Sequence, residues 1–169
     1  MMFQIGEKVV YPSQGIGTIE TISSRCFGAH PETYYLLRLM CGRMTVMVPV
    51  SHAGEIGLRK ITRNGELARV LSFLACRACA SNQAWKDRFK ENSERMRVGG
   101  LLQIAEVLKS LLVLQRHKPL SFREKRMLDR ARQLLVTELG ISRGLVEQQA
   151  AGLIQKSLSK AGLSLPPAL

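Results

Sequence analysis

The chain opens with the stretch Phe3-Gln4-Ile5-Gly6-Glu7-Lys8-Val9-Val10-Tyr11-Pro12-Ser13-Gln14-Gly15-Ile16-Gly17, in which a strand-like run leads into turn residues. Proline and glycine punctuate strands because proline lacks an N–H donor and glycine accepts turn conformations. Further short apolar and β-branched runs follow at close spacing. They cover residues 17–22, 34–40, 44–49 and 56–59. This spacing predicts a small SH3- or Tudor-like β-barrel over residues 1–62, with an edge strand open to pairing with another chain.

From about residue 64 the apolar residues recur at intervals of three and four, which is the period of an α-helix. We expect helices over residues 65–78, 83–97, 101–115, 122–139 and 141–161. Ser121 with Glu124 three residues later forms a capping-box pattern at the start of the fourth helix, and Gly140 is expected to end it. The chain is therefore predicted to be an α+β protein. The β-barrel precedes a compact all-α domain over residues 63–163 and a flexible tail over residues 164–169.

Positive charge is concentrated in the predicted helical part of the chain, whose formal net charge as a whole is +12. Residues 1–60 hold six Lys/Arg and four Asp/Glu, whereas residues 61–169 hold nineteen and nine. A domain with such an excess of cations attracts polyanions, so nucleic acid is the first candidate partner. An anionic membrane surface, or a basic protein without a polyanionic partner, are the alternatives that charge alone leaves open.

The sequence shows no pattern typical of secretion or membrane insertion. The longest apolar runs, such as Leu111–Leu114, are far too short to span a bilayer. The first residues run into strand-like sequence where a signal peptide would have an apolar segment. We therefore expect a cytoplasmic protein without a membrane partner.

Enzymatic chemistry has little support in the sequence. The histidines lie in predicted loops without metal-ligand spacing, and Ser51 with His52 is a neighbouring pair and not a triad. Gly15-Ile16-Gly17 lacks the third glycine and the helix of a nucleotide-binding loop. Cys76 and Cys79 form a CxxC at the predicted end of a helix, where packing is the more common role, although a redox or metal role stays open. We expect no catalytic residue, metal, cofactor or small-molecule substrate.

Trp85 is the single tryptophan of the chain, and it lies among cations at the predicted start of a helix. A flat apolar side chain beside Lys86, Arg88 and Lys90 is suited to wedge into a nucleic-acid groove while the cations contact adjacent phosphates. The fourth predicted helix adds the cations Arg123, Lys125, Arg126, Arg130 and Arg132. The plainer alternatives are that the tryptophan is a core residue and that the basic helical faces are merely solvated. The polar residues beside Trp85 favour the outward orientation.

Four segments carry a family resemblance. The first is the opening stretch, residues 3–17; the others are Met44-Thr45-Val46-Met47-Val48-Pro49, Trp85-Lys86-Asp87-Arg88-Phe89-Lys90-Glu91-Asn92 and Glu124-Lys125-Arg126-Met127-Leu128-Asp129-Arg130-Ala131-Arg132-Gln133-Leu134-Leu135. Together, in order and over residues 3–139, they resemble the CarD/CdnL family of bacterial RNA-polymerase-binding transcription factors. The opening stretch alone also resembles the polymerase-interacting module of the transcription-repair coupling factor. That protein is a large helicase, and the helical half of this chain argues against it.

The resemblance implies that the barrel docks on the β subunit of RNA polymerase, beside the upstream DNA. The residues that fall in the family's polymerase-contact region are Arg25, Leu37, Met47 and Pro49. Met47 departs from those members that have an arginine at this position. The near-neutral charge of the first 60 residues agrees with a protein partner, and edge-strand pairing is a plausible mode.

The resemblance also implies that the helical domain contacts promoter DNA at the upstream edge of the melted region, with the tryptophan as a minor-groove wedge. The expected DNA-contacting residues are Trp85, Lys86, Arg88, Lys90, Lys125 and Arg132. Asp87 departs from the basic residue that other members have next to the wedge. No set of residues suited to reading base edges is present, so DNA binding should be weak and independent of sequence.

The expectation is thus a non-enzymatic, monomeric transcription regulator that binds polymerase and promoter DNA and stabilises the open complex. The alternative is a non-catalytic protein-interaction adaptor whose basic helical domain binds an acidic protein or RNA. A third hypothesis, an enzyme that uses Cys76 and Cys79, predicts that replacing Cys76 by serine abolishes function.

Overall fold

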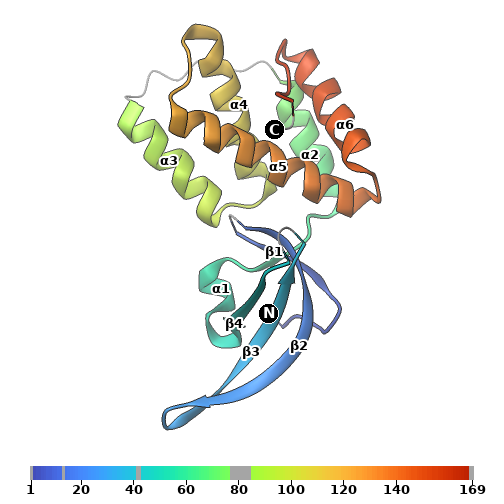
Figure 1. Ribbon diagram of the computed structural model, residues 1–169. Helices are drawn as coiled ribbons and strands as arrows, with labels where there is room; N and C mark the ends of the chain where they lie inside the picture. The colour runs from blue at the N-terminus through green and yellow to red at the C-terminus, as the bar shows by residue number, and fades with distance from the viewer. Residues whose placement is uncertain (1, 13, 41–42, 77–84, 168–169) are drawn as a thin grey trace. The chain divides into compact units, whose positions relative to one another are not determined.

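The computed structural model describes residues 2–12, 14–40, 43–76 and 85–167. The chain divides into two compact units, Met1–Ile61 and Thr62–Leu169. The first unit contains an antiparallel β-sheet and the second contains helices (Figure 1). The predicted α+β fold class is confirmed.

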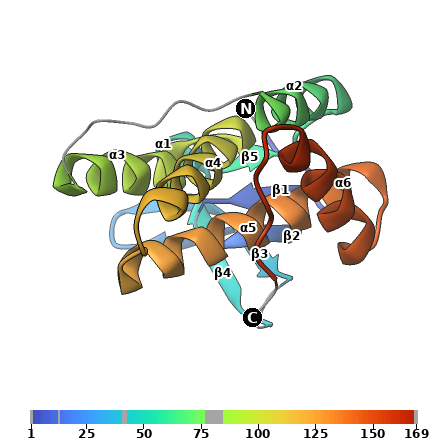
Figure 2. The same ribbon diagram turned by 90° about the horizontal axis from the view of Figure 1, so that it is seen from above.

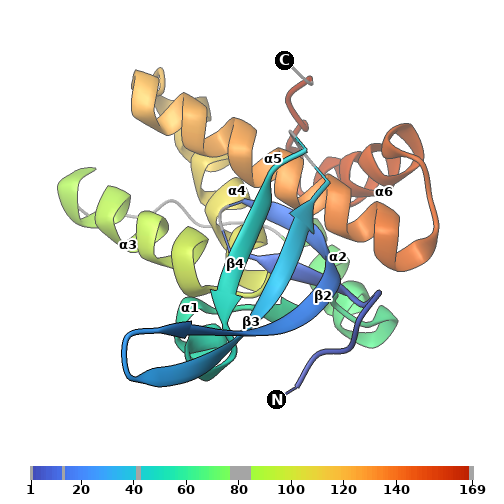
Figure 3. The same cartoon turned by 60° about the horizontal axis from the view of Figure 1, so that its bottom comes forward.

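Five antiparallel strands form the sheet of the N-terminal unit, in the order β4-β3-β2-β1-β5. They are β1 (Lys8–Tyr11), β2 (Gly15–Phe27), β3 (His30–Leu39), β4 (Thr45–Pro49) and β5 (Arg59–Lys60). A 3-10 turn, η1 (Val50–His52), and a short helix, α1 (Ala53–Ile56), follow β4. Within the described residues β4 and β5 are the two edge strands and do not pair with each other, so the sheet is not closed into a barrel by strand pairing. Figure 3 shows β4 beside β3 and the long β2–β3 hairpin, which extends beyond the residues 17–22 expected for the second strand.

The core of the N-terminal unit lies on one face of this sheet. Because side chains alternate along a strand, Tyr35 and Leu37 of β3 point to the same face, where both are fully buried with Ile19 and Val48. The Tyr35 hydroxyl accepts a hydrogen bond from the Phe3 backbone N–H at 3.1 Å. The phenolic group thus fixes the N-terminal residues onto the sheet while its ring fills the core.

The second unit contains five helices in its described residues. They are α2 (Asn64–Ala75), α3 (Trp85–Val98), α4 (Leu101–His117), α5 (Phe122–Arg143) and α6 (Glu147–Lys160). The helix α4 packs against α2, α3 and α5, and α6 packs against α2 and α5 (Figure 2). The largest fully buried aliphatic side chains in this unit are Leu67, Leu74, Leu108, Leu111, Leu135, Ile154 and Leu158. They recur at helical spacing, as the sequence pattern predicted.

The expectation that Gly140 ends the fourth helix was wrong. The helix α5 continues to Arg143, and Gly144 provides the left-handed C-terminal residue with φ of 67°. Gly140 lies inside α5, where a Cβ atom would stand 3.0 Å from the Leu145 carbonyl oxygen. The glycine therefore serves a close approach of the chain that follows and not a helix end.

Residues 163–166 pack onto the helical unit, in contrast to the flexible tail expected over residues 164–169. Leu163 is buried and Leu165 is partly buried against the core. The Leu165 N–H donates to Gln155 Oε1 at 2.6 Å, and Arg132 Nε donates to the Pro166 carbonyl at 2.6 Å. The alternating leucines supply apolar surface that makes ordering of residues 164–167 favourable.

Candidate functional site

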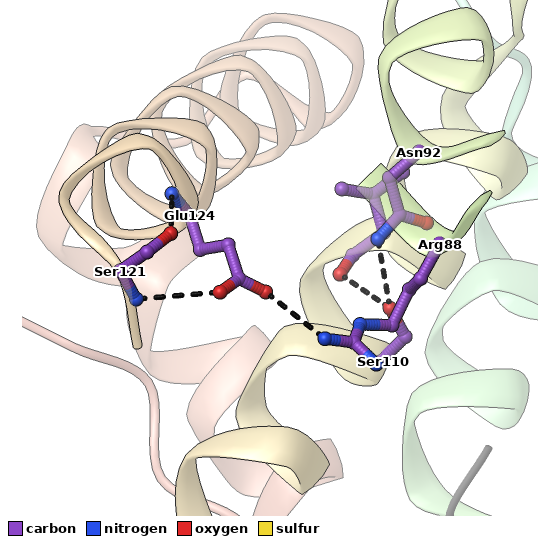
Figure 4. A network of polar contacts seen from close by, with 6 residues as sticks. Arg88, Asn92, Ser110, Ser121 and Glu124 are labelled. Carbon is purple, nitrogen blue, oxygen red and sulfur yellow. Dashed lines mark hydrogen bonds and ion pairs between the residues drawn. The ribbon is translucent and has the colours of Figure 1, made fainter. Parts of the chain in front are cut away.

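The first turns of α3 and α5 lie at the same end of the helical unit (Figures 1 and 2). The helices begin at Trp85 and Phe122, and the views of Figures 1 and 2 agree in placing these two starts at the same end. An ion pair joins them, with Arg88 NH2 3.6 Å from Glu124 Oε2 (Figure 4). Both side chains are buried, with 7% of Arg88 and 3% of Glu124 exposed.

Glu124 also completes the capping box predicted from the sequence. Its backbone N–H donates to Ser121 Oγ at 3.3 Å, and its Oε1 accepts from the Ser121 backbone N–H at 3.3 Å. Because Oε2 faces Arg88, one carboxylate holds the start of α5 and the first turn of α3 at the same time. The position of the Trp85 backbone is therefore tied to α5 through Arg88, three residues later.

The remainder of α3 docks through an inner face that is largely polar. Arg88, Asn92 and Met96 are buried and follow one another at intervals of four, so they lie along one side of the helix. Asn92 Nδ2 donates to Ser110 Oγ of α4 at 3.3 Å (Figure 4). On the partly exposed flank, Arg95 Nε lies 3.5 Å from Glu106 Oε2. Directional polar contacts thus fix the rotation of α3 about its own axis, which apolar packing alone would leave free.

The predicted DNA-contacting residues of α3 fall in different places. Trp85 and Lys86 are the first two residues of the helix, but their side chains lie outside the described part of the structure. Lys90 is exposed, as a phosphate contact requires. Arg88 differs from the phosphate contact that we expected. Its guanidinium is buried against Glu124 and is not placed to contact a DNA backbone in this arrangement.

The two predicted residues of α5 also differ. Lys125 is exposed. Arg132 is only 9% exposed, and its NH1 lies 3.9 Å from Glu147 while its Nε bonds to the C-terminal segment. Arg132 therefore holds α5, α6 and the C-terminal residues together, which differs from the free phosphate contact we expected. It lines an open pocket of about 490 Å³ together with Arg126, Arg130 and Gln133.

A buried lysine closes the C-terminal end of α2. Lys109 of α4 is 4% exposed and donates to the carbonyls of Phe73 and Cys76, each at 2.5 Å. Its Nζ also lies 4.5 Å from the centre of the Phe73 ring. Burial lowers the pKa of Lys109, and the neighbouring Cys76 opposes this shift. Since the last helical carbonyls carry partial negative charge, an ammonium group is well suited to them.

Lys109 should make the stability of the helical unit depend on alkaline pH. Its pKa in the folded chain lies below the unfolded value, which is about 10.4. Between these two values the unfolded state binds more protons, so this group's contribution to the free energy of unfolding rises with pH. We expect the difference in unfolding free energy between the wild type and Lys109→Met to increase in favour of the wild type as pH rises towards 10. Urea titrations at several pH values, followed by Trp85 fluorescence, measure it; a constant difference would contradict the prediction.

The predicted polymerase-contacting residues lie on both faces of the sheet. Met47 and Pro49 of β4 are half-buried and alternate with the buried Val48, so they point to the outer face. Leu37 is fully buried on the inner face and corrects the expectation, because a core side chain does not contact a partner directly. Arg25 is exposed on the β2–β3 hairpin, opposite Glu32.

Two residues that sequence reasoning missed complete an apolar strip beside β4. Leu36 pairs with Met47, and Tyr34 pairs with Pro49, on the same outer face. All four side chains are half-buried, so each keeps apolar surface accessible at the sheet edge. The period of two along β3 would have placed Leu36 outward once Leu37 was assigned to the core.

Ser51 and His52 do meet a carboxylate, but the geometry does not suit catalysis. Ser51 Oγ donates to Glu32 Oε1 at 2.7 Å and lies 3.0 Å from His52 Nδ1. In a nucleophilic triad the histidine separates the serine from the acid, whereas here the carboxylate contacts the serine directly. Ser51 and His52 are also exposed. The contacts tie η1 to β3.

The described residues offer no metal site and no membrane span. No group of three His, Cys, Asp or Glu side chains is placed there to hold an ion. Cys76 is an exposed free thiol at the end of α2, and Cys79 lies outside the described residues. None of the helices found there has both the length and the apolar character required to cross a bilayer.

Two domain families match consecutive parts of the chain. The CarD-like/TRCF RID domain matches residues 3–62, and the CarD C-terminal domain matches residues 69–155. The chain belongs to the CarD family. YdeB of Bacillus subtilis (strain 168) is similar to it, with 34% identity over 148 residues that cover 88% of this chain and 97% of YdeB. The solved structure of CdnLNt from Myxoccoccus xanthus is 34% identical and covers 36% of this chain and 86% of that one, with a TM-score of 0.32.

Membership of the CarD family confirms several expectations. The chain is a transcription regulator with an RNA-polymerase-interacting domain in its N-terminal part. CarD family transcription factors are non-catalytic, in agreement with the expected lack of enzymatic activity.

Proposed function

We propose that this CarD family protein binds the β subunit of RNA polymerase through residues 1–61 and stabilises the promoter open complex through its helical unit. The observation that carries the proposal is the Arg88–Glu124 ion pair, which fixes the first turn of α3 and hence the backbone of Trp85. A wedge has to be held rigidly, because a mobile side chain cannot keep two neighbouring base pairs unstacked.

The polymerase contact is proposed at the outer face and free edge of β4. An edge strand offers unpaired backbone N–H and C=O groups to a strand of a partner. The strip formed by Tyr34, Leu36, Met47 and Pro49 adds apolar surface beside that edge. Arg25, on the hairpin, is a further candidate contact.

The DNA contact is proposed at the starts of α3 and α5. Trp85 is the wedge, and Lys86, Lys90 and Lys125 neutralise neighbouring phosphates, with the last two exposed. Arg88 and Arg132 do not contact DNA in this proposal. Arg88 holds α3 against α5, and Arg132 holds α5 against the segment that contains Pro166. Affinity for free DNA should be low, salt-dependent and insensitive to sequence, since it rests on phosphate contacts. We further propose that the protein is a monomer and acts in the cytoplasm.

The mechanism requires a difference in affinity between the two states of the promoter. A wedge that fits the distorted groove at the edge of melted DNA contacts the open state and has no equivalent site in the closed duplex. A ligand shifts an equilibrium only by its differential affinity for the two states. About 1.4 kcal/mol of such preference changes the ratio of open to closed promoters tenfold.

Replacing Met47 by glutamate should weaken binding to RNA polymerase by about tenfold or more, because a charge would be desolvated in the centre of an apolar contact. Binding of the full chain to immobilised polymerase core enzyme measures this effect. Gln14→Glu adds the same charge at an exposed position of the β1–β2 turn and should change the affinity less than twofold. Equal affinities of Met47→Glu and the wild type would exclude this face as the docking surface.

A further inference from the structure

Among the described residues of the helical unit, Phe122 is the most exposed large apolar side chain, and it lies at the end where α3 begins (Figures 1 and 2). Phe122, the first residue of α5, is 73% exposed. Burial of an exposed aromatic ring is favourable, so this position is suited to a partner that covers the ring. The guanidinium carbon of Arg126 lies 5.8 Å from the ring centre, over one face, and most of the ring stays open.

The exposed charges in the first turn and a half of α5 are all positive, and the next acidic residue of the helix after Glu124 is the half-buried Asp129. Arg123, Lys125 and Arg126 are exposed in the first turn and a half of α5. The acidic residue of this turn, Glu124, is 3% exposed and turns inward to Arg88 and Ser121 (Figure 4). An exposed aromatic ring in a helix turn that carries three exposed cations, with the carboxylate of that turn withdrawn from solvent, is the pattern of a surface that binds a base and its phosphates.

We propose that Phe122 stacks on an unpaired base of single-stranded DNA while Arg123, Lys125 and Arg126 contact the phosphates on either side. A base inside a duplex already has both faces stacked, so only an unpaired base can offer its face to the ring. The guanidinium of Arg126 on the opposite side of Phe122 would add a cation–π contribution to the stack.

Two other classes of partner fit the surface less well. A protein interface needs a desolvated apolar centre of several residues, and the residues one turn along from Phe122 are Lys125 and Arg126. A membrane-surface helix needs a continuous apolar face, which these same cations interrupt. A single flat ring among cations is sufficient for one base and insufficient for either of these.

The inference rests on the proposed contact between the helical unit and promoter DNA, and adds a second contact to it. The ion pair between Arg88 and Glu124 links the first turns of α3 and α5, so Trp85 and Phe122 start two helices at the same end of the helical unit. A melted promoter presents a duplex edge and an unpaired strand side by side. Trp85 would contact the edge of the duplex, and Phe122 would contact the unpaired strand.

The test measures binding of the full-length chain to a fluorescently labelled oligothymidine and to a labelled duplex of similar length, by anisotropy at low salt. Phe122→Ala should lower the affinity for the single strand about tenfold, since stacking on one base is worth about 1–3 kcal/mol. The affinity for the duplex should change less than twofold. Phe122→Leu, which keeps apolar area without a flat ring, should resemble Phe122→Ala, and Phe122→Trp should retain binding.

Val146→Ala is the matched control, because Val146 is also an exposed apolar residue at the start of a helix, with 63% of its surface exposed, but it lies next to Glu147. It should leave both affinities unchanged. In a second measurement, the double variant Trp85→Phe, Phe122→Trp carries a single tryptophan at the proposed stack. Its fluorescence should be quenched by the single strand and unchanged by the duplex.

Three results would overturn the inference. The first is an unchanged affinity of Phe122→Ala for the single strand, and the second is an equal loss for single strand and duplex. The third is competition by polyglutamate that matches competition by the unlabelled single strand, which would point to an acidic protein. None of these bears on polymerase binding or on the effect of Trp85, so the proposed function can survive the loss of this inference. A wild type that binds polymerase and lacks any effect on open complexes would instead remove the proposed function.

Discussion

Replacement of Glu124 by leucine should lower the free energy of unfolding of the helical unit by about 3–5 kcal/mol, because it leaves the buried charge of Arg88 without its carboxylate. It also removes the side-chain half of the capping box at Ser121. Urea unfolding followed by Trp85 fluorescence reports on this unit, since the single tryptophan lies in it. Glu124→Gln should be less severe, because an amide oxygen can still accept from the Ser121 N–H.

Two further variants separate this buried pair from ordinary surface charge. Glu94 lies 2.6 Å from Arg97 on the exposed side of α3, and Glu94→Leu should change the stability far less than Glu124→Leu does, because solvent screens an exposed pair. The double variant Arg88→Met, Glu124→Leu should recover much of the stability lost in Glu124→Leu, since an apolar pair replaces an ion pair at little cost. If Glu124→Leu and Glu94→Leu have similar effects, the ion pair does not anchor α3.

Features encoded locally could be predicted from the sequence. The capping box at Ser121 involves residues three apart, and the helices follow from an apolar period that each segment carries by itself. The burial of Leu37 on the inner face of the sheet was not predictable in this way, because Tyr34 to Leu37 is a continuous apolar run in which alternation cannot be seen. Only its pairing with Ile19 and Val46 assigns it to the core.

Features that depend on two distant segments were missed. Arg88 and Glu124 are 36 positions apart in the sequence, so nothing in the run of cations after Trp85 showed that one of them is buried. Arg132 was misjudged for the same reason, since its partners come from α6 and the C-terminal residues. A glycine can end a helix or permit a close approach, and the sequence alone did not distinguish these roles for Gly140.

Replacing Trp85 by alanine should remove most of the effect of this protein on promoter opening. The indole would fill the distorted groove at the upstream edge of melted DNA, and its loss forfeits the contact that the closed promoter never makes. We expect the ratio of open to closed promoters to be about tenfold lower with Trp85→Ala than with the wild type, which is equivalent to about 1.4 kcal/mol. Polymerase binding should be unaffected, because the tryptophan belongs to the helical unit and the docking strip belongs to the N-terminal one.

The most direct test of the account is the lifetime of competitor-resistant open complexes formed by bacterial RNA polymerase holoenzyme on a promoter fragment. It is measured with the wild type, with Trp85→Ala and with Val146→Ala as an exposed control. We expect the wild type and the control to lengthen the lifetime to the same extent, and Trp85→Ala to do so far less while binding polymerase equally well. A wild type that binds polymerase and leaves the lifetime unchanged would contradict the account and favour an adaptor that binds an acidic protein or RNA.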